Sequence, residues 1–450
     1  MRLQIISLFA LGLTACGGGS SSSSSSGGGD TSGYVISGTI VGLNGNGLTL
    51  VNGKETLTIK SSDTSFAFAT KIATGATYAV TAGSNPFWQK CTVANGSGTV
   101  ASANISNVAV TCVSATVTVK TVAGGTTVVA TPVTGNTDGT GTKALFKNPK
   151  GLIVAPDGNI YIVDTGNNLI RKMTSAGVVT TFAGSGFSGF LDGTTYTANF
   201  NAPTGIAVDK NGNLYIADTG NNAIRKITKM GEVTTLAGSS TAGAEDGLGA
   251  AATFNGPTGL AVDGDGNVYV ADAGNFSIRK ITAGGLVSTL AGGSQGYVNA
   301  TGSSAQFCSP NSAVLNKDGN ILVTDQGAGA VRMITPTGVV TTYVGISAAS
   351  NPGCLGATKG NILFAGIALD SMGTAYATSP LNGTTVMNQI LLITPGGSMI
   401  TLAGGLGAGV TDGTSAKALF DGPQSISVDT NGNLYVADSL SSNIRYISHN

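Results

Sequence analysis

Histidine and glutamate are almost missing from this 450-residue chain, which has one histidine (His449) and three glutamates (Glu55, Glu232 and Glu245). These residue types commonly supply metal ligands and general acid–base groups, so their scarcity argues against an enzyme, a metal site or a cofactor. Charged residues amount to 10% of the chain, against about 25% in ordinary soluble domains. The 22 basic and 22 acidic residues balance, which gives no sign of binding to nucleic acid.

Long hydrophobic runs are also absent after the first residues, so we expect no transmembrane helix. The N-terminal stretch MRLQIISLFALGLTAC combines one early cation, a short apolar run and small residues, which is typical of a signal peptide. Its last four residues, Leu13–Cys16, resemble the bacterial lipoprotein box. This resemblance implies that a signal segment, residues 1–16, ends at a lipid-modified Cys16 whose palmitate-type acyl chains hold the protein on a membrane. A plain secretory signal with a chance cysteine is the alternative.

The residues after Cys16 indicate where the protein resides. By the same resemblance, Gly17 in place of an aspartate implies sorting to the outer membrane. We therefore expect a lipid-anchored protein of the bacterial cell envelope, either periplasmic or surface-exposed. Residues 17–33 are mostly Gly and Ser and predict a flexible tether between the lipid and the folded part.

Four further cysteines follow, and an even number in an exported chain points to disulfides with three possible pairings. Residues 34–114 contain short runs of alternating apolar and polar residues, which predict a small antiparallel β-sandwich. Cys91 and Cys112 both lie at strand-like positions of this domain, so we expect them to pair. The ending CTVANGSGTV…NVAVTC resembles Ig-like or transthyretin-like modules of bacterial surface lipoproteins. Trp88, the only tryptophan, is interpreted as a packing residue, with a ligand platform as the alternative.

The rest of the chain repeats itself. A Gly-Asn pair (once Gly-Thr) recurs at spacings of 54, 54, 53, 54 and 59 residues, which indicates six copies of one unit. The second copy, residues 200–238, reads FNAPTGIAVDKNGNLYIADTGNNAIRKITKMGEVTTLAG. This pattern resembles NHL repeats, and the resemblance implies a six-bladed β-propeller over residues 115–450. The four strands expected in this copy, a to d, lie near Gly205–Val208, Leu214–Ala217, Ala223–Ile227 and Val233–Ala237.

The two ends of the repeat region complement each other. The sixth copy stops after its third strand, and residues 117–125, VTVKTVAGG, match the character of a fourth. We therefore expect this N-terminal segment to close the ring as the outer strand of the last blade. The predicted fold is all-β: a six-bladed NHL-type β-propeller preceded by a small antiparallel β-sandwich.

The hairpin between strands b and c carries a recurring pair of charges. In the second copy Asp218 and Arg225 are seven residues apart, and a four-residue turn places them as diagonal neighbours on one side of the hairpin. A catalytic group would be needed once. A pair present in five copies is better explained as a structural salt bridge, because losing one buried partner is costly. The other four pairs are Asp164 with Arg171, Asp272 with Arg279, Asp325 with Arg332 and Asp438 with Arg445.

Other polar clusters also have structural interpretations. Asn221 and Asn222 are expected to be turn residues. The stretch Asp263-Gly-Asp265-Gly-Asn267 resembles the start of a calcium loop, but its twelfth position is Gly274 instead of Glu, which favours an a–b turn. Four aspartates recur in the d–a connections and are expected to fold these loops through Asx turns without binding metal: Asp138, Asp192, Asp246 and Asp412.

The fifth copy departs from the pattern. Ser379 and Leu391 replace the charged pair, and an excess of five residues lies between them. The d–a connection before this copy lacks the repeat's Phe and Pro and carries Cys354. Because Cys308 lies in the neighbouring connection on the same face, we expect a disulfide, with two free thiols as the alternative. The copy has either drifted or forms a partner-binding patch, for which the candidate residues are Leu381, Asn382, Thr384, Val386 and Asn388.

The sequence therefore predicts a function without catalysis. We expect a monomeric platform that binds an unknown protein or glycan and is attached to a membrane through its lipid. One alternative is a hydrolase or lyase with a metal site in the central channel. The His-rich or Glu-Asn-Asp sites of such propeller families cannot be mapped onto this chain residue by residue. The other alternative is a structural component of the envelope.

Overall fold

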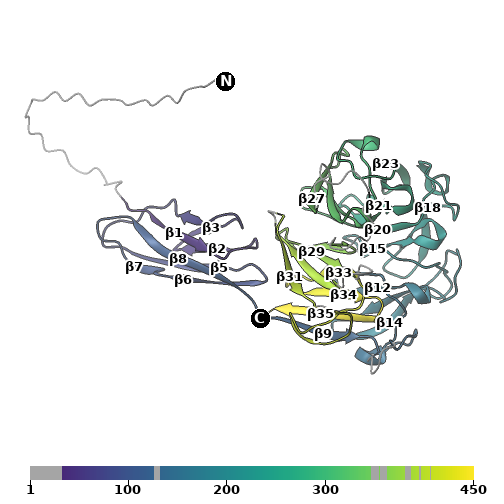
Figure 1. The fold of residues 1–450 in the computed structure, drawn as a ribbon, viewed down its shortest axis with the longest axis horizontal. Coiled ribbons are helices and arrows are strands. Elements are labelled where there is room, and N and C mark those ends of the chain that lie inside the picture. The colour runs from purple at the N-terminus through teal and green to yellow at the C-terminus, as the bar shows by residue number, and fades with distance from the viewer. Residues whose placement is uncertain are drawn as a thin grey trace, which may run out of the picture.

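The computed structural model describes residues 33–125, 132–345, 354, 362–380, 387–394, 397–405 and 407–449. These residues form a small β-module and a larger ring of β-sheets (Figure 1), which confirms the predicted all-β class. None of the helices in this described part is long and apolar enough to cross a membrane. They are short 3₁₀ segments: η1 (Gly141–Lys143), η2 (Thr165–Asn167), η3 (Thr219–Asn221), η4 (Gly249–Ala251), η5 (Ala273–Asn275), η6 (Gly302–Ser304) and η7 (Gln326–Ala328).

The small module consists of two four-stranded sheets, ordered β4-β1-β8-β6 and β3-β2-β5-β7. Alternating side chains such as Ile36 and Ile40 point into one shared core, where they meet Val108 and Leu50. This alternation is what places one face of each strand inside. The strands are β1 (Ile36–Val41), β2 (Thr49–Asn52), β3 (Glu55–Thr58), β4 (Ser65–Ala67), β5 (Thr77–Ser84), β6 (Gln89–Ala94), β7 (Ser97–Thr99) and β8 (Ile105–Ser114).

One pairing in the module differs from the antiparallel sandwich predicted from the sequence. β1 and β8, the first and last strands, run parallel, with Thr39 opposite Ala109 and Ile40 opposite Val110. The other pairings are antiparallel. Side-chain alternation sets which face of a strand is buried, but it carries no information about the direction of the neighbouring strand. The expectation of a purely antiparallel module was therefore wrong.

The larger part of the chain forms six antiparallel sheets. In the first five, four strands that follow one another in the sequence pair as a meander. In the sixth, three such strands pair with β9 from the N-terminal side. We call these sheets blades 1 to 6 and their strands a to d. Blade 1 consists of β11 (Gly151–Val154), β12 (Ile160–Asp164), β13 (Leu169–Met173) and β14 (Val178–Ala183), and blade 2 of β15 (Ile206–Val208), β16 (Leu214–Asp218), β17 (Ala223–Ile227) and β18 (Val233–Gly238). Blade 3 consists of β20 (Pro257–Val262), β21 (Val268–Asp272), β22 (Ser277–Ile281) and β23 (Leu286–Gly292), and blade 4 of β24 (Pro310–Leu315), β25 (Ile321–Asp325), β26 (Ala330–Ile334) and β27 (Val340–Gly345). Blade 5 consists of β28 (Ile367–Leu369), β29 (Ala375–Ser379), β30 (Gln389–Ile393) and β31 (Met399–Ala403), and blade 6 of β33 (Pro423–Val428), β34 (Leu434–Asp438), β35 (Asn443–His449) and β9 (Val117–Ala123).

Among the described residues, three blades carry an additional two-residue strand on their outer edge. These are β10 (Gly139–Thr140) on blade 1, β19 (Gly247–Leu248) on blade 3 and β32 (Gly413–Thr414) on blade 6. In blade 2, each observed strand boundary agrees with the predicted one to within a residue.

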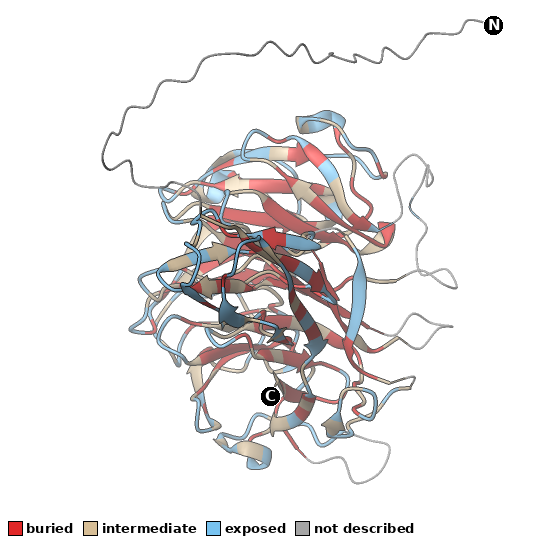
Figure 2. Cartoon of the chain, turned by 90° about the vertical axis from the view of Figure 1, so that its left-hand side faces the viewer, coloured by how far each residue is buried: buried red, intermediate tan, exposed pale blue. Residues whose placement is uncertain are grey.

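Apolar cores lie between neighbouring blades, and they explain why the b strands of blades 1 to 5 are buried along their whole length. Between blades 1 and 2, for example, Ile170 packs with Phe200 and Ile216. An equivalent core joins blade 6 to blade 1 through Ile444 and Ile162, so the blades form a closed ring. Figure 2 shows the resulting contrast between buried strands and exposed loops. Strands that are covered on both faces need apolar residues on both, which the LYIAD-type segments supply.

The ring is closed by a strand from the N-terminal side, as the sequence predicted. β9 pairs antiparallel with β35, with Val119 opposite Ile447 and Ala123 opposite Ile444. β9 thereby becomes the outer strand of blade 6, beside the C-terminal strand β35 (Figure 1). The first and last parts of the repeat region therefore share one sheet, which leaves blade 6 with a full set of strands.

The small module and the propeller meet at blades 5 and 6. Only Ala115 and Thr116 separate β8 from β9. Trp88, which is 5% exposed, inserts between the two parts and donates a hydrogen bond from Nε1 to the Tyr376 hydroxyl at 2.9 Å. Its ring packs with propeller residues in the core of blades 5 and 6. The structure therefore gives Trp88 a packing role between the two parts.

Candidate binding face

The b–c hairpins and the d–a connections lie on one face of the propeller, which we call the connection face. In blade 2, Asp218 at the end of strand b accepts a hydrogen bond from the backbone N–H of Asn201, which belongs to the preceding d–a connection. The 3₁₀ segment η3 then turns the chain, and Asn222 adopts the left-handed conformation (φ 47°) that starts strand c. The a–b and c–d turns lie at the opposite ends of the strands, on what we call the turn face.

Each predicted hairpin pair forms an ion pair. In blade 2, Ile216 lies opposite Arg225 and Asp218 lies opposite Ala223, so the two charged residues are diagonal neighbours. Arg225 Nη1 and Asp218 Oδ2 are 2.8 Å apart, and both side chains are fully buried. The equivalent distances are 2.9 Å for Arg171–Asp164, 2.9 Å for Arg279–Asp272, 3.1 Å for Arg332–Asp325 and 3.3 Å for Arg445–Asp438.

Each of these arginines has a second polar partner in the preceding connection. Arg225 Nη2 lies 2.6 Å from Asp192 Oδ1, and the other oxygen of Asp192 accepts a hydrogen bond from the N–H of Thr235. Three more aspartates repeat the arginine contact: Asp138 with Arg171, Asp246 with Arg279 and Asp412 with Arg445. In blade 4 this position is an amide, and Asn299 accepts from Arg332 at 2.8 Å. The expected Asx-turn role of the connection aspartates was wrong, because their carboxylates bind an arginine and a neighbouring strand.

We call the arginine with its hairpin Asp and its connection Asp or Asn the arginine clasp. In blade 2, the guanidinium also donates to the carbonyl oxygens of Asn199 and Leu191 at 3.0 and 2.9 Å. The Phe200 ring lies 5.2 Å from the guanidinium carbon, which is within the range of a cation–π contact. The clasp therefore fastens each connection to the following hairpin from inside the protein. The buried arginine and hairpin aspartate are therefore structural and are not available to a ligand.

Burial and hydrogen bonding shift the clasp carboxylates in opposite directions. Burial raises the pKa of Asp164 to about 6, although hydrogen bonds from Asn167 and Lys147 and the charge of Arg171 act against the shift. Burial raises the pKa of Asp438 to about 6 in the same way. Partial burial tends to raise the pKa of the half-exposed Asp192, but hydrogen bonds from Thr235 and Arg225 outweigh this effect and lower the pKa overall. Asp192 therefore holds its charge more readily than Asp164 and Asp438 do.

The two asparagines of the hairpin are turn residues, as predicted, and one of them does more. Asn222 takes the left-handed turn position, and its Oδ1 accepts a hydrogen bond from the N–H of Gly256. Asn221 donates through Nδ2 to Asp218 and to the carbonyl of Gly189, both at 2.8 Å. Asn221 therefore belongs to the same network as the clasp.

The calcium-like stretch in blade 3 forms an a–b turn, as predicted. Asp263 Oδ1 accepts from the N–H groups of Asp265 and Asn267, at 3.0 and 2.8 Å. Its Oδ2 accepts from Asn267 Nδ2 and from the Tyr269 hydroxyl. Within the described part of the chain, no group of three or more His, Cys, Asp or Glu side chains is placed to hold a metal ion.

Blade 5 has no clasp at its hairpin. Ser379 and Leu391 occupy the Asp and Arg positions of strands β29 and β30, and both are buried. Phe364 fills the core between blades 4 and 5 together with Leu391, so a Phe is present although it is displaced from the repeat position. Ser379 Oγ has no hydrogen-bond partner in the described structure. An apolar contact thus stands where the other blades have buried charges.

Of the five residues predicted as a partner patch, the structure describes only Asn388. This side chain is fully buried, and its Oδ1 accepts a hydrogen bond from the N–H of Gly422 at 3.1 Å. Asn388 therefore cannot contact a partner, and that part of the prediction was wrong. Leu381, Asn382, Thr384 and Val386 lie outside the described residues, as does the lipidation candidate Cys16.

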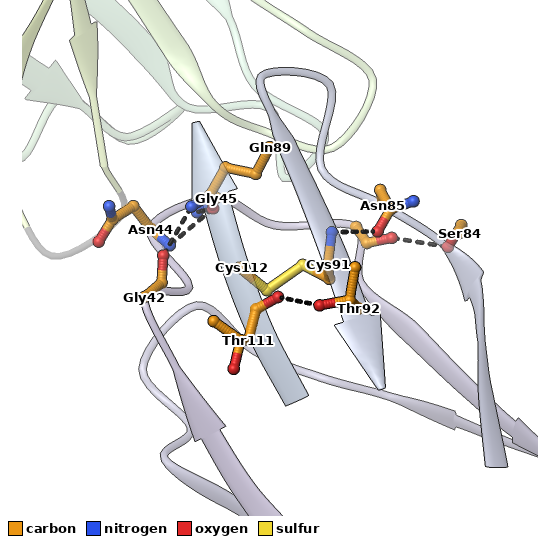
Figure 3. Close-up of a disulfide and its surroundings, with 11 residues drawn as sticks. Gly42, Asn44, Gly45, Ser84, Asn85, Gln89, Cys91, Thr92, Thr111 and Cys112 are labelled. Atoms are coloured by element: carbon orange, nitrogen blue, oxygen red, sulfur yellow. Dashed lines mark hydrogen bonds between the residues drawn. A yellow bond between two sulfur atoms is a disulfide. The ribbon is translucent and has the colours of Figure 1, made fainter. Parts of the chain in front are cut away.

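Both expected disulfides are present. Cys91 and Cys112 lie directly opposite each other on β6 and β8, and their sulfurs are 2.01 Å apart. Figure 3 shows this bond and the nearby hydrogen bond from the N–H of Cys91 to Asn85. Cys308 and Cys354 join the connections before blades 4 and 5, with a sulfur distance of 2.08 Å. These bonds support a chain that matures in an oxidising compartment.

The a strands surround a central channel of about 490 Å³. At its mouth on the connection face lie five polar residues within two positions of the start of an a strand: Lys150, Thr204, Thr258, Asn311 and Gln424. Deeper in, apolar residues such as Ile206 and Leu260 line the wall. A side chain at Gly205 would collide with the carbonyl of Thr258, so close packing of neighbouring a strands requires a glycine there.

One connection exposes four apolar side chains that the sequence analysis missed. In the connection that leads into blade 2, Phe187 is 75% exposed, Tyr196 73%, Leu191 54% and Phe190 39%. We call these four residues the aromatic connection. The equivalent position of Leu191 is Glu245 before blade 3 and Thr411 before blade 6. Comparing connections aligned on their clasp aspartates would have revealed this enrichment.

The comparisons with known proteins agree with this architecture. The NHL repeat model matches residues 200–227 and 254–281. The Arabidopsis thaliana protein SUPPRESSOR OF QUENCHING 1, chloroplastic, is 42% identical over 94 residues, which are 21% of this chain and 9% of that protein. The chain thus spans a small fraction of this relative.

Two solved structures share the fold over most of their length. A protein of unknown function from Bacteroides thetaiotaomicron has a TM-score of 0.55 at 16% identity, over 89% of this chain and 90% of its own. An auxiliary nutrient binding protein from Bacteroides ovatus has a TM-score of 0.52 at 15% identity, over 94% and 99%. At such low identity these structures support the fold alone.

Proposed function

We propose that this NHL-repeat β-propeller is a non-catalytic binding module, held on the bacterial cell envelope by a lipid on Cys16, and that it binds a protein through its connection face. The aromatic connection carries this proposal. Four apolar side chains are exposed in this one connection, while the hairpin arginines and aspartates are buried. Exposed apolar clusters of this kind are typical of contact surfaces for other molecules.

The chemistry of the aromatic connection favours a protein over a glycan. Phe187, Phe190 and Leu191 are purely apolar, and Tyr196 adds a ring with a hydroxyl. Aromatic residues are enriched in the buried centres of protein interfaces, where truncating them has the largest effect on affinity. The ring of Phe190 lies 5.0 Å from the guanidinium carbon of Arg225, so the blade 2 clasp supports one of these side chains from below.

The arrangement of the small module and the propeller also favours the connection face as the binding surface. The small module contacts the a–b turns of blades 5 and 6, where Asn46 donates to the carbonyl of Met372 and Phe87 packs against Gly432. These turns belong to the turn face. A tether that enters through the small module therefore leaves the connection face unobstructed.

The proposal is tested by affinity capture and crosslinking from the native envelope with the full chain and a Phe187→Ser/Tyr196→Ser variant. We expect the variant to lose at least about tenfold in partner affinity with an unchanged melting temperature, because both side chains are solvated in the free protein. Leu248→Ser, at a residue that is 63% exposed on another connection, is the matched control. Equal capture of the partner by the two variants would contradict the proposal. So would a result in which the full chain binds purified envelope glycans and captures no protein.

A further inference from the structure

A partly open cavity of about 400 Å³ lies at the contact between the small module and the propeller. One wall comes from the module, through Pro86, Phe87 and Trp88, and the other from blades 5 and 6, through Tyr376, Leu392 and Ile400. This volume lies within the range of about 300–1,000 Å³ that is typical of small-molecule sites, which often form between domains. The cavity is separate from the connection face, so its role does not depend on the function proposed above.

The lining of this cavity is uncharged, and its exposed surface is mainly apolar although neutral polar residues such as Asn44, Gln89 and Thr401 also contribute. None of the described residues that line it is Asp, Glu, Lys, Arg or His. Three aromatic side chains, Phe87, Trp88 and Tyr376, contribute to its walls, and the rings of Trp88 and Tyr376 meet edge to face with centroids 6.2 Å apart. Charged ligands would lose their hydration in such a site without gaining a partner. The lining therefore selects against charge and favours flat apolar groups.

The rings are fixed in place by a hydrogen-bonded chain. Trp88 Nε1 donates to the Tyr376 hydroxyl, and this hydroxyl donates to Asp370 Oδ2 at 2.8 Å. On the open side, the hydroxyl groups of Thr116 and Thr414 form no hydrogen bond within the described part of the chain and are exposed. The site thus combines preformed aromatic walls with polar groups at its entrance, which is a usual arrangement for orienting a ligand.

We propose that this cavity is a binding site for an uncharged, mainly apolar ring compound that carries at most one or two hydroxyl or carbonyl groups. The ring stacks among Phe87, Trp88 and Tyr376, and its polar group faces Thr116 and Thr414 at the entrance. Since the walls come from both parts of the chain, an occupant also fastens the small module to blades 5 and 6.

Trp88 makes the test specific, because it is the only tryptophan of the chain. The probe is N-phenyl-1-naphthylamine, an uncharged ring compound that accepts excitation energy from tryptophan and becomes fluorescent in apolar sites. With the full chain, we expect saturable binding of one equivalent, with Trp88 emission falling as probe emission rises. Its sulfonated relative, 1-anilinonaphthalene-8-sulfonate, has the same rings and a negative charge, and it should bind at least about tenfold more weakly.

Two single variants on β31 locate the site. Ile400 lines the cavity and is 38% exposed, whereas the adjacent Met399 is 39% exposed and is not part of the lining. We expect Ile400→Glu to weaken probe binding at least about tenfold and Met399→Glu to leave it unchanged, with both variants retaining the melting temperature of the unliganded protein. The proposal is overturned if Trp88 emission does not respond to the probe, if both glutamate variants bind alike, or if the sulfonated compound binds as tightly.

Discussion

Blades 2 and 5 have the same b and c strands in the same register, but the centres of their hairpins differ in chemistry. Blade 2 encloses Asp218 and Arg225, and blade 5 encloses Ser379 and Leu391. Both arrangements are compatible with a four-stranded blade. The comparison shows that the propeller fold does not require the buried charges. This agrees with the general finding that a buried ion pair and a well-packed apolar replacement are often similar in stability.

The difference also shows what the clasp adds. Arg225 holds the preceding connection through two carbonyl oxygens and Asp192. Blade 5 has no arginine at this position, and the connection that precedes it carries Cys354, which is bonded to Cys308. A covalent bond therefore fastens this connection where the other blades use a clasp. Blade 5 still contains one unfavourable group, because Ser379 Oγ is buried without a hydrogen-bond partner in the described structure.

Removing only one member of the blade 2 pair should have the largest effect. Arg225→Leu leaves the buried carboxylate of Asp218 without its guanidinium, and an unpaired buried charge costs about 3–5 kcal/mol. We expect the free energy of unfolding, measured by urea denaturation followed by circular dichroism, to fall by this amount. The double variant Asp218→Ser/Arg225→Leu, which copies blade 5, should regain at least about 2 kcal/mol. Equal losses in the single and double variants would mean that the unpaired charge is not the cause.

The buried hairpin carboxylates should produce a pH-dependent effect of intermediate size. Burial raises the pKa of Asp164 from its usual 3.8 to about 6, so the folded protein holds this proton more tightly than the unfolded chain does. The contribution of Asp164 to stability is then fully present at low pH and is lost as the pH rises through about 6. The loss of stability caused by Asp164→Asn should therefore be about 1 kcal/mol greater at pH 5 than at pH 8, as measured by urea denaturation. A difference of the opposite sign would show that the ion pair with Arg171 outweighs burial.

Exchanging a connection aspartate for its amide should have the smallest effect. Asp192 is 49% exposed at its side chain, and blade 4 already has Asn299 at the equivalent place. We expect Asp192→Asn to lower the free energy of unfolding by less than about 1 kcal/mol, because half-exposed ion pairs contribute little. Asp192→Leu, which removes the acceptor for both Arg225 and Thr235, is the comparison and should cost more. If the amide variant is as unstable as Arg225→Leu, the connection carboxylate is as important as the hairpin one.

Repetition made most of this fold predictable. Six copies of one pattern indicated the blades and their strands, and the joint loss of Asp and Arg in one copy indicated that they pair. The closing strand was predicted from the missing fourth strand of the last copy. Each of these inferences rests on comparing equivalent positions, which single motifs do not allow.

The features that were missed lack a short-range signal. The connection aspartates lie 33 residues before the arginines that they bind, as in Asp192 and Arg225. The same spacing recurs in four other blades, but it links two different repeat units. The parallel pairing of β1 and β8 depends on how the module packs and not on its local pattern. The aromatic connection lies in a loop, where no periodicity separates exposed from buried residues.

The pairing of β9 with β35 also determines the order in which the molecule can be completed. A chain synthesised from its N-terminus forms the small module and β9 long before β35 exists. Until β35 emerges, the edge of β9 that pairs with it is open, and such an open edge can pair with a wrong strand. Since this contact joins the two ends of the repeat region, its loop-closure entropy makes it a slow step.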